Sequence, residues 1–79
     1  MFEAVNEEAV RRLFLQVRFE RRRSQVDVAR RAGCSVSLVS ALEAGGWYPR
    51  RRRGFETLRR LVEVGLETPA GEFERRIGG

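Results

Sequence analysis

Four consecutive arginines are the side chains of this sequence most suited to binding chemistry. They are Arg50, Arg51, Arg52 and Arg53. A guanidinium keeps its charge and donates several hydrogen bonds, so such a run fits phosphate groups or a narrow minor groove of nucleic acid. The alternative is a disordered charged loop that supplies only general attraction to a polyanion. Trp47 and Tyr48 precede the run and can stack on bases, although aromatic pairs in loops more often fold back on the core or a partner subunit.

Enzymatic and metal chemistry are disfavoured by the residue inventory. The chain has no histidine and a single cysteine, Cys34, so it lacks an internal disulfide, a ligand set for zinc and the usual general base. Its glutamates are spread along the sequence and form no clustered acidic site. We therefore expect no enzyme, no bound metal and no cofactor. Cys34 is interpreted as a small packing residue, with a redox-sensing thiol as the open alternative.

The charge balance favours a nucleic acid as partner. The 79 residues carry a net charge of +5, and a small basic chain binds nucleic acid more readily than a membrane surface. No apolar run approaches the roughly 20 residues that span a bilayer, and the first residues do not resemble a secretory signal. The expected location is the cytoplasm, on the nucleoid.

The elements that position these side chains are predicted to be helices. Asn6 is expected to cap a first helix that begins at Glu7 and ends around residues 21–23. Its apolar stripe consists of Val10, Leu13, Phe14 and Val17. Ser24 resembles the first residue of a capping box and places the start of a second helix at Gln25.

A tight turn between two helices is the clearest local pattern. Gly33 is expected to stop the second helix, and Ser35 to cap a third helix over residues 36–44. Val39 and Leu42 should face inward on that third helix. The chain must turn sharply between two helices separated by so short a segment, which leaves the outer face of the third helix exposed.

The remainder of the chain is predicted as a long basic loop over residues 45–54 and two further helices. The apolar stripe of the fourth helix is Phe55, Leu58, Leu61, Val62 and Leu66, and Gly65 is its expected terminator. Thr68 and Pro69 should cap and open a short fifth helix that carries Phe73 and Ile77. The fold class is therefore all-α, with residues 1–79 forming a single domain.

Residues 24–45 resemble the helix-turn-helix family of Cro/C1-type (XRE-like) DNA-binding proteins. The positions that carry the resemblance are Ser24, Gln25, Ala29, Gly33, Ser35, Val39, Ser40, Leu42, Glu43 and Gly45, with Arg18 in register upstream. The resemblance implies a compact five-helix bundle of the lambda-repressor-like type, with the helix-turn-helix at about residues 25–44. It also implies a salt bridge between Arg18 and Glu43, which would tie the first helix to the third.

The resemblance also assigns the residues that would face DNA. The positions expected at base edges are Ser35, Val36, Ser37, Ser40 and Ala41. Their short side chains imply thin direct readout, by serine hydroxyls and apolar contact with thymine methyls. Gln25 matches a position that contacts a phosphate, and relatives place the arginine loop against the DNA backbone. The alternatives are a small-residue helix face and a glutamine that are merely exposed to water.

The sequence departs from the family before Ser24 and in the arginine loop. Arg22 and Arg23 stand where relatives have glycine and an apolar residue, so either the first helix continues or the connection is solvated. The loop before Phe55 is also several residues longer than in relatives.

The implied function is sequence-specific binding of double-stranded DNA by a transcription repressor. A dimer is expected, because two half-sites of an inverted repeat double the contacts. The candidate interface residues are Leu66, Phe73 and Ile77, with burial in the core as the alternative. The competing hypotheses are an antitoxin-like regulator that also binds a protein partner, and an RNA-binding module that uses the arginine loop. No small-molecule effector is evident from the sequence.

Overall fold

Local capping explains where the first helix begins and ends. The computed structural model describes Phe2 and residues 6–78, and its first helix, α1, spans Glu7–Glu20. The Asn6 side chain accepts a hydrogen bond from the Ala9 amide (3.2 Å), as predicted. The helix ends just before the expected range because Arg22 adopts a left-handed conformation (φ +54°). The amides of Arg22 and Arg23 then close a Schellman motif on the last turn.

The connection before α2 is only partly solvated. Arg22 is exposed, but Arg23 is half-buried and donates to the Glu67 carboxylate (2.6 Å). The same carboxylate oxygen accepts from Arg31 (2.7 Å), so Glu67 binds two arginines that lie far from it in the sequence. Continuation of α1 beyond this point, one of the two sequence-based alternatives, is therefore wrong.

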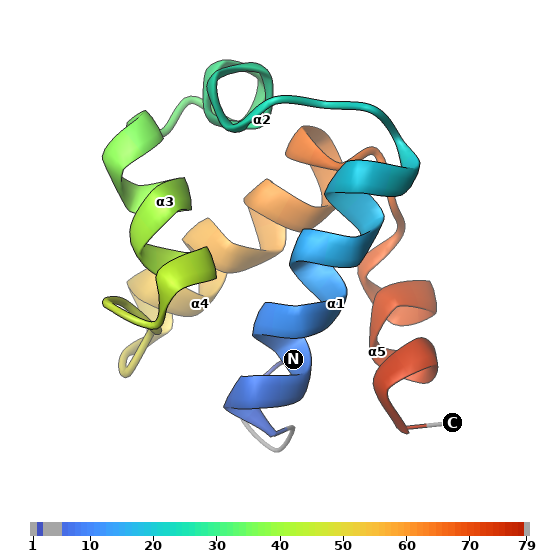
Figure 1. Cartoon of the computed structure of the whole chain (residues 1–79). Helices are drawn as coiled ribbons and strands as arrows, with labels where there is room; N and C mark the ends of the chain where they lie inside the picture. The colour runs from blue at the N-terminus through green and yellow to red at the C-terminus, as the bar shows by residue number, and fades with distance from the viewer. Residues whose placement is uncertain (1, 3–5, 79) are drawn as a thin grey trace.

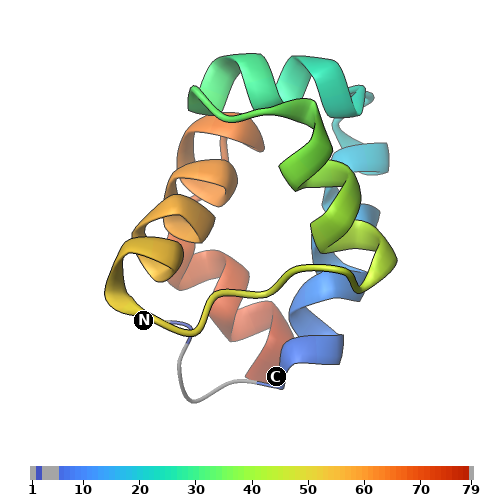
Figure 2. The ribbon, with the colours of Figure 1, turned by 90° about the vertical axis from the view of Figure 1, so that its left-hand side faces the viewer.

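Helices α2 (Gln25–Ala32) and α3 (Val36–Ala44) have the predicted bounds. The Ser24 hydroxyl accepts from the Asp27 amide (3.0 Å), and the Ser35 hydroxyl accepts from the Leu38 amide (3.2 Å). Gly33 takes the left-handed conformation that ends α2 (φ +71°), and Gly45 does the same after α3 (φ +90°). The connection from Gly33 to Ser35 forces α3 to leave α2 at a steep angle (Figure 2).

Helix α4 begins earlier than the sequence predicted. It spans Arg52–Arg60 and continues without a break as a π-helical turn, η1 (Leu61–Gly65). Arg52, Arg53 and Gly54, which were expected in the basic loop, therefore form the first turn of α4. The loop is shorter than expected because residues 47–50 lie across this turn, where a Cβ on Gly54 would come within 2.8 Å of Pro49 Cβ.

The predicted start of the last helix is also corrected. Helix α5 spans Ala70–Gly78, and Thr68 does not cap it, because its buried hydroxyl donates to the Leu66 carbonyl (3.1 Å). The Ala70 amide instead donates to the Glu63 carboxylate (3.4 Å). A side chain seven residues upstream has thus replaced the local cap that the sequence pattern favoured.

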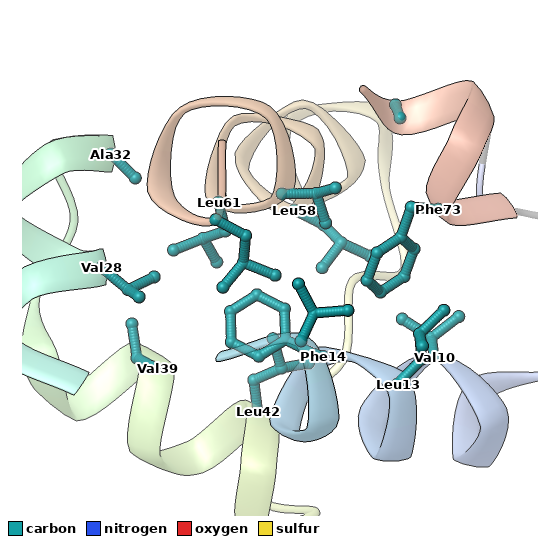
Figure 3. Packing of buried hydrophobic residues seen from close by; sticks show 14 of the residues in the cluster. Val10, Leu13, Phe14, Val28, Ala32, Val39, Leu42, Leu58, Leu61 and Phe73 are labelled. Atoms are coloured by element: carbon teal, nitrogen blue, oxygen red, sulfur yellow. The ribbon is translucent and has the colours of Figure 1, made fainter. Parts of the chain in front are cut away.

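The helices surround one apolar core. Within the described residues there are five α-helices, one π-helical turn and no strand, in a body of 27 × 26 × 19 Å. Helices α3 and α5 flank α1 on opposite sides, and α2 lies across one end (Figure 1). Side chains from α1, α2, α3, α4, η1 and α5 meet in the centre (Figure 3). Phe2, which the sequence analysis left without a role, is fully buried and packs edge-to-face on Phe73 (5.9 Å between ring centroids).

Gly65 is the last residue of η1, but its role differs from the one predicted. It was expected as a terminator with a positive φ, but the left-handed residue after the helix is Glu67 (φ +52°). Gly65 is buried against α2, where a Cβ would lie 2.8 Å from Val28 Cγ1 and 3.2 Å from the Val28 carbonyl oxygen. Its missing side chain is what allows α2 and η1 to approach closely.

Candidate functional site

The outer face of α3 presents small side chains to solvent. Ser35, Val36, Ser37 and Ser40 are exposed, and Val36 retains 41% of its accessible surface although it is apolar. Ala41, the fifth predicted member of this face, is half-buried, and a Cβ on Gly46 would lie 3.7 Å from its Cβ. The structure therefore brings four of the five predicted base-contacting residues onto one open surface and leaves Ala41 at its edge.

An ion pair holds α3 to α1. The Arg18 guanidinium donates to both carboxylate oxygens of Glu43, at 2.5 and 2.9 Å, which confirms the predicted salt bridge. Arg18 also donates to the Arg23 carbonyl (3.0 Å), so one guanidinium fixes α1, α3 and the connection between α1 and α2. Both side chains are largely buried, with 11% and 7% of their surface exposed.

Gln25 belongs to the same network, which the sequence did not indicate. Its side-chain amide donates to Glu43 Oε1 (2.9 Å), and Gln25 is half-buried at the start of α2. A glutamine amide has two N–H groups, so one remains to meet an anion approaching the N-terminus of α2. The contact could be anticipated only through Glu43, because a carboxylate oxygen that already accepts from Arg18 can accept a second hydrogen bond.

A second arginine of α1 also holds the C-terminal end of α3. Arg11 Nε donates to the Leu42 carbonyl (2.9 Å), and its two terminal nitrogens donate to Glu7 and Glu8, at 2.9 Å each. Its side chain is only 13% exposed. Arg11 therefore clamps the start of α1 to the last turn of α3.

The segment that carries the arginines is packed and ordered by contacts. Trp47 and Tyr48 are half-buried on the core, Pro49 is buried, and Tyr48 meets Phe55 edge-to-face at 6.2 Å between ring centroids. The Trp47 amide donates to the Ala41 carbonyl (3.2 Å). The aromatic pair therefore folds back on the core, and the alternative of a disordered charged loop is wrong.

The four arginines themselves are exposed around the start of α4. Arg51 is the N-terminal capping position and makes no side-chain capping bond, and the first turn contains no acidic residue. Arg52 pairs with Glu56 (3.5 Å) along the helix. Positive side chains at a helix N-terminus add to the positive end of the helix dipole, so this corner concentrates positive potential.

A groove lies beside these arginines. It has a volume of about 690 Å³ and is bounded by the start of α1, residues 45–50 and the first turn of α4. Its lining includes the polar and aromatic side chains of Glu7, Trp47, Tyr48, Arg50, Arg51 and Arg53. Arg52 is absent from the lining, so three of the four consecutive arginines are brought to one concave surface.

Two of the three residues predicted at a dimer interface do not lie at the surface. Leu66 and Phe73 are fully buried in the core of the single chain, where they pack with residues of α1 and α4, so they are not available to a second chain. Ile77 is half-buried and keeps part of its side chain at the surface. Phe2 packs edge-to-face on Phe73 and thereby helps to bury it.

Cys34 lies in the turn between α2 and α3. It is half-buried against the core, as expected for a small packing residue. The Arg60 guanidinium lies nearby and donates to the Ala32 carbonyl at the end of α2 (2.9 Å). Arg60 of α4 therefore satisfies a carbonyl in the last turn of α2. No local sequence pattern indicated this contact.

The described residues contain neither a membrane-spanning helix nor a metal-binding cluster. None of the described helices is long and apolar enough to cross a bilayer. Across residues 6–78 and Phe2, the structure shows no cluster of three or more acidic or cysteine side chains that could hold a metal ion. Comparison with protein-family models, curated proteins and solved structures found no match.

Proposed function

We propose that this chain is a helix-turn-helix domain of the lambda-repressor-like type that binds double-stranded DNA in a sequence-specific manner. The observation that carries the proposal is the two-sided character of α3. Val39 and Leu42 are fully buried on its inner side, while Ser37 and Ser40 are exposed on its outer side. A helix held in this way at a sharp turn can insert its N-terminal half into a major groove.

Direct readout by this face relies on short side chains. The exposed hydroxyls of Ser37 and Ser40 can donate to or accept from base edges, and Val36 can contact a thymine methyl. None of these residues makes the bidentate contacts that arginine or glutamine makes to purines. Most of the affinity must then come from phosphates, which Gln25 and the exposed arginines at the start of α4 are suited to bind.

The proposed regulator is a homodimeric repressor that acts on an inverted repeat. Two copies related by a two-fold axis place two α3 helices about one turn of DNA apart, roughly 34 Å, and double a modest set of contacts. Of the three interface residues predicted from the sequence, Ile77 alone remains partly accessible. We therefore place the interface at the end of α5.

The test is selection of the full chain from a random duplex DNA pool at moderate salt, followed by affinity measurements. The expected result is an enriched inverted repeat, bound at least roughly a thousandfold more tightly than its scrambled version. Binding to all duplexes with equal, salt-sensitive affinity would contradict the proposal. Equal affinity for structured RNA would favour the RNA-binding hypothesis, and a monomer on a single half-site would contradict the dimer alone.

A further inference from the structure

The groove beside the arginines is large enough to hold a small molecule. Its volume of about 690 Å³ falls within the range of about 300–1,000 Å³ that is typical of ligand pockets. We infer that it binds a free nucleotide that carries two or more phosphates. Nucleotide binding goes beyond the proposed DNA-binding function and does not depend on it.

The arginine end of the groove suits a polyphosphate. Arg50, Arg51 and Arg53 all line it, and within the described part of the chain none of the three forms an ion pair. Arg52, by contrast, points out of the groove and pairs with Glu56 (3.5 Å). Guanidinium groups bind phosphate oxygens in bidentate geometry, so three of them can hold the two or three phosphates of one nucleotide.

The other end of the groove suits a base. Trp47 follows Gly46 in the lining and is the aromatic residue nearest to Gly45 in the sequence, and Glu7 is the acidic residue of the lining. Arg11 donates to the Glu7 carboxylate (2.9 Å), and a Cβ on Gly45 would lie 3.7 Å from that guanidinium, which puts Glu7 at the Gly45 end, away from the arginines. A carboxylate repels phosphate but accepts hydrogen bonds from an exocyclic amine, so the lining favours a ligand with one anionic and one neutral end.

The groove is preformed and needs no closure to bind. Pro49 is buried, Gly54 lets it lie directly on the first turn of α4, and Tyr48 packs on Phe55. Residues 47–50 therefore hold their positions without a ligand, which lowers the entropy cost of binding.

If the proposed function holds, the same arginines meet DNA phosphates, and a nucleotide in the groove competes with DNA. This consequence alone rests on the proposed function. It would make the affinity for DNA fall as the nucleotide concentration rises, because each arginine can satisfy only one phosphate at a time.

The test uses the fluorescence of Trp47, the single tryptophan of the chain, during titration with ADP. Saturable quenching is expected, with Arg53→Ala weakening ADP by about tenfold or more and Arg52→Ala changing the affinity by less than about twofold. Both variants remove one exposed arginine from the first turn of α4, so they are matched in charge and in helix position. Adenosine should bind far more weakly than ADP, as should pyrophosphate.

Three outcomes would overturn the inference. No saturable binding of ADP would remove the site, equal losses in the two variants would mean general attraction, and equal affinity for pyrophosphate and ADP would remove the base-binding end. Displacement of DNA is measured separately, by fluorescence anisotropy of labelled duplex. ADP binding without any DNA binding would contradict the proposed function and leave the nucleotide site standing.

Discussion

Arg18 of α1 and Glu43 of α3 meet through two hydrogen bonds, 2.5 and 2.9 Å long, with both side chains almost out of contact with water. Glu43 also accepts from Gln25 of α2 (2.9 Å). One carboxylate therefore joins the three helices around the tight turn. It fixes the angle of α3, on which the proposed entry into a DNA groove depends.

Replacing Arg18 by methionine should destabilise the fold strongly. It leaves Glu43 buried without its charge partner, which typically costs about 3–5 kcal/mol. The double variant Arg18→Met with Glu43→Leu should recover much of this loss, because it removes both charges. Urea unfolding of the four members of the cycle measures the coupling. A loss below about 0.5 kcal/mol in Arg18→Met would show that the pair behaves like an exposed one.

Gly65→Ala should reduce stability because its Cβ would collide with Val28. The new atom would lie 2.8 Å from Val28 Cγ1, and forcing extra volume into a packed contact costs about 1–3 kcal/mol. Gly71→Ala in α5 is the control, since its Cβ would meet nothing within 4 Å and should stabilise the helix by about 0.5–1 kcal/mol. Thermal unfolding distinguishes the two. Equal stabilisation by both would mean that α2 and η1 do not approach closely.

Ser37→Glu should abolish specific DNA binding and leave the fold intact. Ser37 is exposed at the second residue of α3, where an acid is favourable to the helix dipole but repels phosphate. Gly71→Glu places the same charge at the second residue of α5, on the opposite side of α1 (Figure 1). Electrophoretic mobility shift on the selected operator should separate them. Unchanged affinity in Ser37→Glu would remove α3 from base recognition.

Removing the groove arginines should flatten the salt dependence of DNA binding. The variant carries alanine at Arg50, Arg51 and Arg53. Each lost phosphate contact lowers the slope of log K against log salt by about 0.9, so a decrease of about 2–3 per chain is expected, equally for all sequences. The control carries alanine at the exposed residues Arg12, Arg21 and Arg75. Equal slopes for the two triple variants would show that the arginines act only through net charge.

Acidification should weaken the contact between α1 and α5. The pKa of Glu20 is lowered from its usual 4.5, chiefly by the hydrogen bond from Arg76 and further by that from Gln16. Because the folded pKa lies below the unfolded one, the stabilisation is present above about pH 4.5 and is lost as the pH falls through the folded value. Carboxyl NMR titration should show the Glu20 pKa rising in Arg76→Ala, and an unchanged pKa in that variant would contradict the contact.

The arginine cluster illustrates how a functional pattern can be visible in sequence while its geometry is not. The run of four arginines was evident from the sequence. Which of them line the groove was not, because that depends on where α4 begins. Once Arg52 and Arg53 are helical, successive side chains point about 100° apart, so Arg53 lines the groove and Arg52 does not.

The sequence by itself determined the features that depend on neighbours along the chain. Asn6, Ser24 and Ser35 cap the helices they were predicted to cap, and Gly33 ends α2, because caps and left-handed turns involve residues a few positions apart. The Arg18–Glu43 pair was also anticipated, although only through the family resemblance.

Tertiary structure alone decided what depends on residues far apart in the chain. The burial of Phe73 beneath Phe2, the need for glycine at position 65, and the recruitment of Gln25 by Glu43 all arise from packing between distant segments. An apolar residue on a helix stripe gives the same sequence pattern whether it faces the core of its own chain or a second chain. Only the positions of the surrounding helices separate the two cases, which is why Leu66 and Phe73 belong to the core of a single chain.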